Sequence, residues 1–357
     1  MDNGETFGML DLMVQEAFCV EQGIITHVNQ AAKARLIEEG TGIQALIRTG
    51  AQEYQNFTDG CLYLTLELGG TPCGASVTRV GETDIFVLEQ EADRRELQSM
   101  ALAAQELREP LSSIMTIAEH LFPVAGQSED PEVLAQIAQI NRGLFKMLRV
   151  IGNMSDAARY DSERQGRQEV RNITSLMAEL FQRASSLMEN GDIRLTYTGL
   201  QETVYCSLDA EKLERAVYNM LSNAMKFTPK GGSIEAKFTR RGKFLYLSVQ
   251  DSGPGITEQL RSSVHSRFMR QPALEDGRFG IGLGMVLIRS AAAIHGGTVL
   301  IDHPDRKGTR ITISLEIRQP SNPTLHNNLL RVDYAGERDH GLIELSDVLP
   351  AKAYEKD

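Results

Sequence analysis

Two glycine clusters between Asp251 and Gly284 are the strongest chemical signal in the sequence. The first, Asp251-Ser-Gly-Pro-Gly-Ile256, follows a strand-like run, and the second, Gly280-Ile-Gly-Leu-Gly-Met285, opens an apolar helix. Glycines at this spacing let backbone amides approach a phosphate chain because no Cβ stands in the way, and a helix N-terminus adds a favourable dipole. Taken alone, such a cluster is more often a simple turn.

A second group of polar residues lies on a predicted helix that begins after Asp209 and ends before Pro229. Asn219 and Asn223 are four residues apart and therefore share one face of this helix. Their carboxamides could hold a hydrated Mg²⁺ beside phosphates, with Lys226 supplying a positive charge. By spacing alone, two solvated asparagines on an amphipathic helix are the favoured explanation of the pattern.

The order of these motifs resembles the ATP-binding domain of sensor histidine kinases over about residues 166–317. The matching positions are Asn219, Asn223, Lys226, Phe227, Asp251, Gly253, Gly255, Phe268, Gly280, Gly282 and Gly284. Several matching motifs in one order predict this domain far better than any of them singly.

The resemblance also implies roles for these residues. Asp251 would accept a hydrogen bond from the adenine amino group, and Asn223, together with Asn219, would bind Mg²⁺ beside ATP. The glycines of the second cluster would surround the phosphates from a lid. Lys226 would lie near those phosphates, and Phe268 would be the aromatic residue of the family's phenylalanine box.

One position separates this chain from the ATP hydrolases that share the nucleotide fold, which include type II topoisomerases, mismatch-repair ATPases and heat-shock ATPases. Those enzymes place a glutamate four residues before the Mg²⁺-binding asparagine, where it activates water as a general base. This chain has Asn219 there. Phosphoryl transfer to a protein group is therefore favoured over rapid hydrolysis.

Composition and charge narrow the class of protein. The 357-residue chain is long enough for two or three domains, and its net charge of −11 argues against a nucleic-acid surface. No apolar run reaches the roughly eighteen residues of a membrane span, so a soluble, cytoplasmic protein without a transmembrane segment is expected. Four scattered cysteines suggest buried thiols in a reducing compartment: Cys19, Cys61, Cys73 and Cys206.

We predict an α+β multidomain protein with four parts: a PAS-like sensor domain over 1–90, a dimerisation and phosphoacceptor-like helical hairpin over 91–165, an α/β-sandwich ATP-binding domain over 166–317 and a C-terminal appendage over 318–357. The stretch Glu21-Gln-Gly-Ile-Ile-Thr-His-Val-Asn-Gln-Ala-Ala32 resembles the opening of a PAS domain. In the appendage, 329–334 and 341–345 are interpreted as two short strands.

Heptad spacing predicts that the hairpin dimerises as a four-helix bundle. Its apolar positions are Leu107, Leu111, Ile114, Ala118 and Leu121, followed after a break by Val133, Ile137, Ile140, Leu144, Met147, Ile151, Met154 and Ala158. Such a stripe needs a partner, most simply a second copy of the chain.

The hairpin also resembles the family's acceptor region at Ala104-Gln-Glu-Leu-Arg-Glu-Pro-Leu-Ser-Ser-Ile114. The position of the phosphorylated histidine is Gln105, whose amide is not a nucleophile at neutral pH. Glu106 matches the neighbouring acidic residue, and Glu109 stands where the family has its phosphatase residue. Two other histidines, His120 and His295, are interpreted as helix-end residues that are favourable against the C-terminal dipole.

Three functions remain open on the sequence. The first is a two-component sensor histidine kinase, a transferase that signals to a response regulator, with its acceptor replaced by Gln105. The second is a non-enzymatic scaffold that responds to ATP and Mg²⁺. The third is a structural dimer that no longer binds nucleotide, which the joint presence of Asn223, Lys226 and Asp251 makes least favourable.

Overall fold

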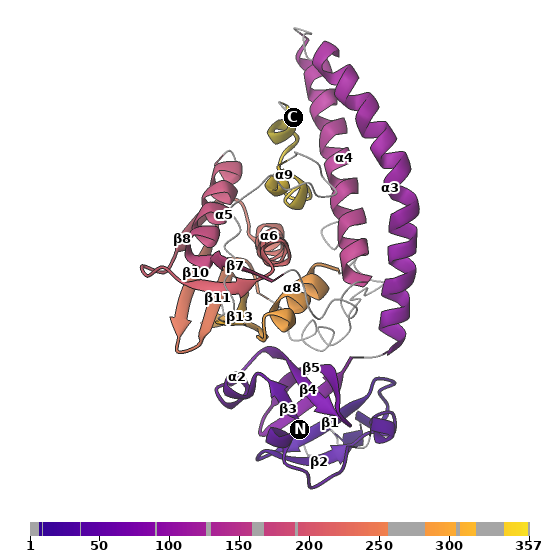
Figure 1. Ribbon diagram of the computed structural model, residues 1–357, viewed down its shortest axis with the longest axis vertical. Coiled ribbons are helices and arrows are strands. Elements are labelled where there is room, and N and C mark those ends of the chain that lie inside the picture. Colours follow the sequence, from indigo (N-terminus) through magenta and orange to yellow (C-terminus); the bar gives the residue numbers. More distant parts are fainter. Residues whose placement is uncertain are drawn as a thin grey trace.

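The computed structural model describes residues 7–8, 10–35, 37–89, 91–125, 130–158, 168–189, 192–255, 283–304, 308–318 and 339–355. Within these residues, N-terminal strands lie at one end of the molecule, a second group of strands and helices occupies the middle, and a long helical hairpin runs alongside (Figure 1). No helix among the described residues is long and apolar enough to cross a membrane.

The N-terminal region is an antiparallel sheet in the order β2-β1-β6-β5-β4. Its elements are β1 (Ala17–Glu21), β2 (Ile24–Val28), β3 (Ile47–Thr49), α2 (Ala51–Gln55), β4 (Cys61–Leu68), β5 (Thr71–Val80) and β6 (Thr83–Leu88). A turn at Gly23, which has a positive φ, joins β1 and β2. Phe18 and Phe86 stack with 4.8 Å between their ring centroids, and both belong to this region's own core.

The hairpin consists of α3 (Glu91–Ala125) and α4 (Pro131–Ala158), as the heptad spacing predicts. Only part of the predicted apolar stripe is buried within the chain, where Leu111, Leu144 and Ile151 belong to the main core. A second set stays exposed: Leu102, Leu107, Ile114, Ile117, Leu121, Leu134, Ile140, Met147 and Val150.

The C-terminal half is a mixed sheet in the order β12-β13-β11-β10-β8, with β8 parallel to β10. Its elements are β7 (Glu169–Asn172), α5 (Ile173–Met188), β8 (Arg194–Thr198), β9 (Tyr205–Leu208), α6 (Ala210–Phe227), β10 (Ser233–Arg241), β11 (Phe244–Asp251), α8 (Leu283–Ile294), β12 (Val299–Asp302) and β13 (Arg310–Glu316). Asp209 caps α6, as predicted, by accepting from Lys212 N at 3.1 Å.

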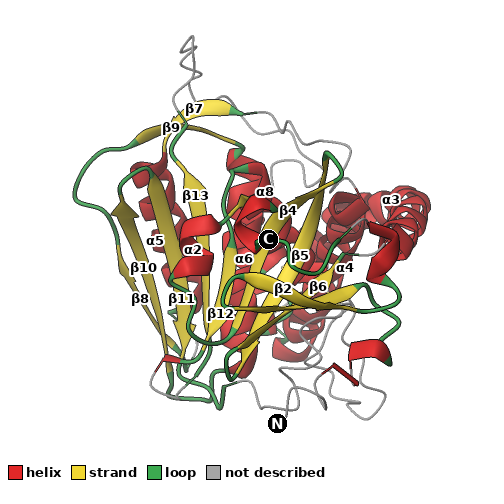
Figure 2. Cartoon of the chain, turned by 90° about the horizontal axis from the view of Figure 1, so that it is seen from below, coloured by secondary structure: helices red, strands yellow, loops and turns green. Residues whose placement is uncertain are grey.

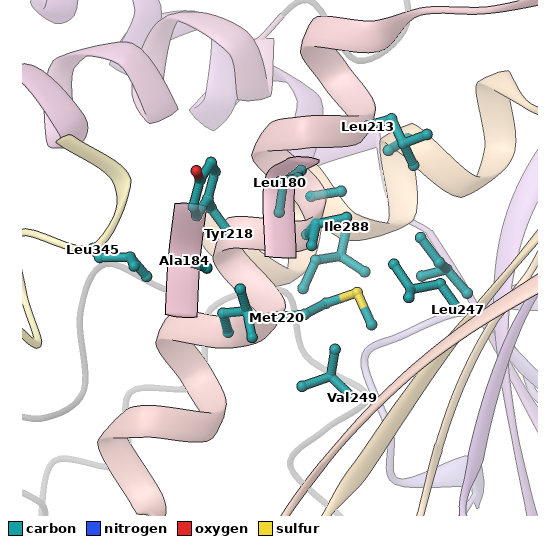
Figure 3. Packing of buried hydrophobic residues seen from close by; sticks show 14 of the residues in the cluster. Leu180, Ala184, Leu213, Tyr218, Met220, Leu247, Val249, Ile288 and Leu345 are labelled. Atoms are coloured by element: carbon teal, nitrogen blue, oxygen red, sulfur yellow. The ribbon is translucent and has the colours of Figure 1, made fainter. Parts of the chain in front are cut away.

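A single core forms between this sheet and its helices. Alternate side chains of β11 are buried, and Leu247 and Val249 face Met220 of α6 and Ile288 of α8 (Figure 3). The period-2 pattern of the strands and the apolar stripe of α6 meet here, and the core positions the end of β11 beside the helices.

The two sheets join into one. β4 pairs with β12 through Tyr63 and Val299, which gives an 11-stranded sheet within the described residues (Figure 2). Gly60 allows this approach, because a Cβ there would lie 2.1 Å from the Ile301 carbonyl oxygen. The strands of the predicted 1–90 and 166–317 regions are therefore hydrogen-bonded to each other.

The end of the chain returns to the hairpin. The strand predicted over 341–345 is wrong, because His340–Glu344 form the short helix α9, and the strand predicted over 329–334 lies outside the described residues. Asp339 caps α9 by accepting from Gly341 N at 2.6 Å. A short apolar run fits a strand or a helix turn equally well, and here the capping aspartate selects the helix. A 3-10 helix, η4 (Ala351–Tyr354), follows.

Candidate nucleotide-binding site

Helix α6 carries the two predicted Mg²⁺ ligands one turn apart. Asn219 is only 2% exposed. Its amide donates to Arg215 O at 2.8 Å, and its Oδ1 accepts from Arg149 Nη2 at 3.3 Å. Asn223 is half-buried, and its carboxamide has no hydrogen-bond partner among the residues that the structure describes. Asn223 is therefore the better placed of the two to offer an oxygen to a cation.

Lys226 lies in the last turn of α6, and its ammonium has an acidic partner. Its Nζ is 3.1 Å from Asp347 Oδ2 of the C-terminal segment. Burial lowers the pKa of Lys226, and the Asp347 carboxylate offsets part of that shift. For Asp347, burial alone would raise the pKa, but the positive charges of Arg149 and Lys226 outweigh it and hold the pKa below its ordinary value. The carboxylate is thus charged at neutral pH.

Asp251, the predicted adenine contact, ends β11 and is 6% exposed. Its Oδ1 accepts from Gly253 N at 2.8 Å, and its backbone N–H donates to Thr309 O at 2.9 Å. Burial raises the pKa of Asp251, although hydrogen bonds from the backbone partly counteract this. The carboxylate oxygens accept hydrogen bonds, which is the chemistry that a ligand donor such as an exocyclic amine requires.

The first glycine cluster is a close contact between elements. A Cβ on Gly253 would lie 2.4 Å from the Phe227 carbonyl oxygen, at the end of α6. Gly255 has φ +78, and a Cβ there would lie 3.0 Å from Gly308 O. Gly253 therefore lets the turn after Asp251 sit against the helix that carries Asn223 and Lys226, and Gly255 lets the same turn approach the chain at Gly308.

The second glycine cluster is described only at its end. Gly284 lies in the first turn of α8, and a Cβ at this position would be 3.0 Å from Asn219 Oδ1. The predicted lid residue and the predicted Mg²⁺ ligand therefore lie side by side. Phe268, Gly280 and Gly282 fall outside the described residues.

The structure does not bring the acceptor region to this site. Gln105 and Glu106 are exposed on α3, and neither forms a hydrogen bond or an ion pair with another residue that the structure describes. Nearby, Arg108 Nη2 donates to Ser155 Oγ of α4 at 3.1 Å.

Sequence reasoning missed a buried charge cluster beside the site. Arg215 Nε is 3.0 Å from Glu344 Oε1, and Arg149 lies between Glu344, at 3.6 Å, and Asp347, at 2.5 Å. Charged residues usually mark solvated faces, so no local pattern identifies these as buried. The one available signal is the regular spacing of Arg142 and Arg149 on α4, which places them on one face.

Comparison with known proteins agrees with this geometry. Residues 208–319 match the family model described as "Histidine kinase-, DNA gyrase B-, and HSP90-like ATPase". Sensor protein kinase PmrB of Pseudomonas aeruginosa is 30% identical over 233 residues, which are 64% of this chain and 47% of that protein. Sensor histidine kinase WalK of Bacillus subtilis is 26% identical over 239 residues, which are 65% of this chain and 39% of that protein.

The chain therefore contains an α/β ATPase domain of the histidine kinase type. The chain is also similar to the sensor kinases PmrB and WalK over about two thirds of its own length, and it spans less than half of the length of either relative. A crystal structure of full-length ShkA in complex with AMPPNP is 18% identical, covers 64% of this chain and 47% of that one, and gives a TM-score of 0.49.

Proposed function

We propose that this chain binds ATP with Mg²⁺ and transmits a signal in the manner of a sensor histidine kinase, with phosphoryl transfer prevented at Gln105. The observation that carries the proposal is the meeting of three distant motifs. The turn after Asp251 lies against the end of α6, and Gly284 of α8 lies against Asn219 on the same helix. Residues far apart in the chain thus lie along one helix, α6, and offer the chemistry that a nucleotide requires.

Each residue has a defined role in this proposal. The buried Asp251 carboxylate accepts a hydrogen bond from the adenine amino group, and it disfavours bases that have no hydrogen-bond donor at that position. Lys226 offers a positive charge to the phosphates, and the N-terminus of α8 at Gly284 offers backbone amides. Asn223 would hold Mg²⁺ with Asn219, and the ion would neutralise charge on the phosphates.

The acceptor position limits the chemistry. Gln105 offers a neutral amide, so no phosphoramidate forms there, whereas a histidine at this position would have Glu106 beside it as a general base. A second function has its own support: Gln105 is exposed and unengaged, as it would be in a scaffold that responds to nucleotide without transferring phosphate.

The first experiment measures phosphate incorporation from Mg²⁺-ATP into the chain and into Gln105→His, by intact mass and acid lability. Incorporation in Gln105→His alone would establish a kinase that lacks its acceptor, and Gln105→His combined with Asp251→Asn is the matched negative control. Nucleotide binding without incorporation in either protein would establish the scaffold. Absence of nucleotide binding in all of them would contradict the proposal.

We also propose that the chain is a homodimer with a PAS-like N-terminal domain and that a response regulator is a possible partner. The exposed apolar residues of α3 and α4 support the dimer, because Leu107, Ile114 and Met147 are each more than a third exposed in a single chain. Light scattering at micromolar concentration should give twice the chain mass. Ile117→Glu, in the centre of this exposed set, should shift the protein towards monomer.

A further inference from the structure

The C-terminal segment 339–355 is docked between α4 and α6, the hairpin helix and the helix of the nucleotide site (Figure 1). Its apolar side chains are part of the main core: Leu342, Ile343, Leu345, Leu349 and Tyr354 are each at most 4% exposed. Tyr354 packs edge-on against Phe145 of α4 at 5.2 Å, and Leu345 lies near Tyr218 of α6 (Figure 3). The segment therefore connects the ATPase domain to the hairpin.

Polar contacts fix the same segment to α4. Arg142 donates to Ser346 O at 3.1 Å and to Asp347 O at 3.2 Å, and Asn141 Nδ2 donates to Tyr354 O at 3.3 Å. These bonds satisfy the backbone carbonyls that follow α9. Hydrogen bonds from α4, one of the two hairpin helices, therefore hold Asp347 in its position.

Two acidic residues of the segment, Glu344 and Asp347, differ in their surroundings. Glu344 is 1% exposed and bridges two arginines, Arg215 and Arg149, which is the arrangement of a structural ion pair. The Asp347 side chain is 29% exposed and lies between Arg149 and Lys226, and the Lys226 side chain is 14% exposed. Asp347 therefore occupies the open end of the cluster, against the residue that is proposed to face the phosphates.

An arginine and a lysine that converge on one partly exposed oxyanion form a favourable site for a phosphate group. A carboxylate and a phosphate present the same chemistry to these cations, namely negatively charged oxygens that accept hydrogen bonds. We propose that Lys226 and Arg149 form a phosphate subsite for the bound nucleotide. Asp347 occupies this subsite in the present structure, so the C-terminal segment competes with Mg²⁺-ATP. The inference rests on the proposed nucleotide-binding function.

Through Arg149, docking of the C-terminal segment also affects the proposed Mg²⁺ site. The same guanidinium that meets Asp347 donates to Asn219 Oδ1, the oxygen that would face Mg²⁺. When a phosphate draws Arg149 away from Asn219, that oxygen becomes free. Docking of the segment and completion of the metal site are thus opposed through a single side chain.

The test compares Asp347→Asn with Glu355→Gln, an exposed carboxylate of the same segment that serves as the matched control. Calorimetric titration of each protein with Mg²⁺-ATP should give roughly tenfold tighter binding for Asp347→Asn, because the ion pairs of Asp347 with Arg149 and Lys226 no longer have to be broken. Adenosine, which has no phosphate, should bind both variants and the unaltered protein equally. Glu355→Gln should leave both affinities unchanged.

A second measurement uses the unaltered chain. Amide hydrogen exchange over 339–355 should accelerate when Mg²⁺-ATP is added and stay unchanged with adenosine. Equal ATP affinities for the unaltered protein and Asp347→Asn, with exchange in the segment unaffected by ATP, would overturn the competition and leave the nucleotide-binding function standing. If no variant binds ATP while all are folded by circular dichroism, both proposals fail.

Discussion

The imidazole of His295 accepts a hydrogen bond from the backbone N–H of Asp209, with 2.9 Å between Nε2 and the amide nitrogen. Its Nδ1 lies 2.7 Å from Ala291 O, so Nδ1 carries the proton and the ring is neutral. His295 is at the end of α8, as predicted, but a favourable charge against the helix dipole is not its role. Instead, it joins the end of α8 to the cap of α6.

This bond predicts a pH dependence of folding stability. Burial lowers the pKa of His295 from its ordinary value of 6.5. Between that value and the lower folded pKa, the unfolded chain binds a proton that the folded chain does not. The free energy of unfolding should therefore fall as pH decreases below about 6.5. Urea unfolding at several pH values measures this, and His295→Gln, less stable by about 1–3 kcal/mol, should flatten the dependence. If the free energy of unfolding of His295→Gln depended on pH as strongly as that of the unaltered protein, His295 would not be the source of the dependence.

Asp251→Asn tests the adenine contact. The substitution replaces an acceptor that faces the ligand with an amide and should weaken Mg²⁺-ATP binding by roughly ten- to a hundredfold, the worth of a hydrogen bond to a charged group. The melting temperature should change little, because asparagine keeps the oxygen that accepts from Gly253 N. Ser252→Ala, at the neighbouring position, is the control in the same turn. Unchanged ATP affinity in Asp251→Asn would refute the contact.

The junction of the two sheets can be tested with a matched pair of glycines. Gly60 has φ +96, with the Ile301 carbonyl in the way of a Cβ, whereas Gly40 has φ +86 and open space around it. Both alanine variants carry similar backbone strain, so their difference isolates the steric contact. We expect Gly60→Ala to lower the free energy of unfolding by at least about 1 kcal/mol more than Gly40→Ala. Equal losses would place β4 and β12 apart in solution.

An ion pair beside this junction offers a further prediction. Arg289 of α8 pairs with Glu89, which follows β6, and its guanidinium lies 4.2 Å from the ring centroid of Tyr63 in β4. Removing one partner of a buried pair leaves an uncompensated charge, so Arg289→Met should cost about 3 kcal/mol of unfolding free energy. The double variant with Glu89→Gln should recover part of the loss in a urea double-mutant cycle. Strict additivity would argue against the pair.

Much of the fold could be predicted from the sequence because its signals are local. The cap at Asp209 and the stop before Pro229 indicated the bounds of α6. The glycines after Asp251 indicated a close backbone approach; in the structure Gly253 approaches the Phe227 carbonyl, and the approach to a phosphate chain stays a prediction. The site roles of Asn219, Asn223 and Lys226 remain predictions, but their helix and its position beside the turn are confirmed by the geometry.

The rest depends on contacts between distant residues. The pairing of Tyr63 with Val299 joins two edge strands whose complementarity no local pattern encodes. The strand predicted over 341–345 failed because five residues are too few to distinguish the two periodicities. The burial of Arg149 and Glu344 could not be foreseen, since each is buried only because the other is present.

The hydrogen-bonded junction of β4 and β12 has a consequence for how the N-terminal region can influence the rest. Side chains alternate between the faces of a strand, so a slip of one residue would expose the buried face of β12 to solvent. Small sliding movements are therefore forbidden, and the ladder either holds in one register or separates. Because β12 follows α8 in the chain, a rearrangement of α8 relative to the N-terminal strands requires this ladder either to move as one unit or to separate.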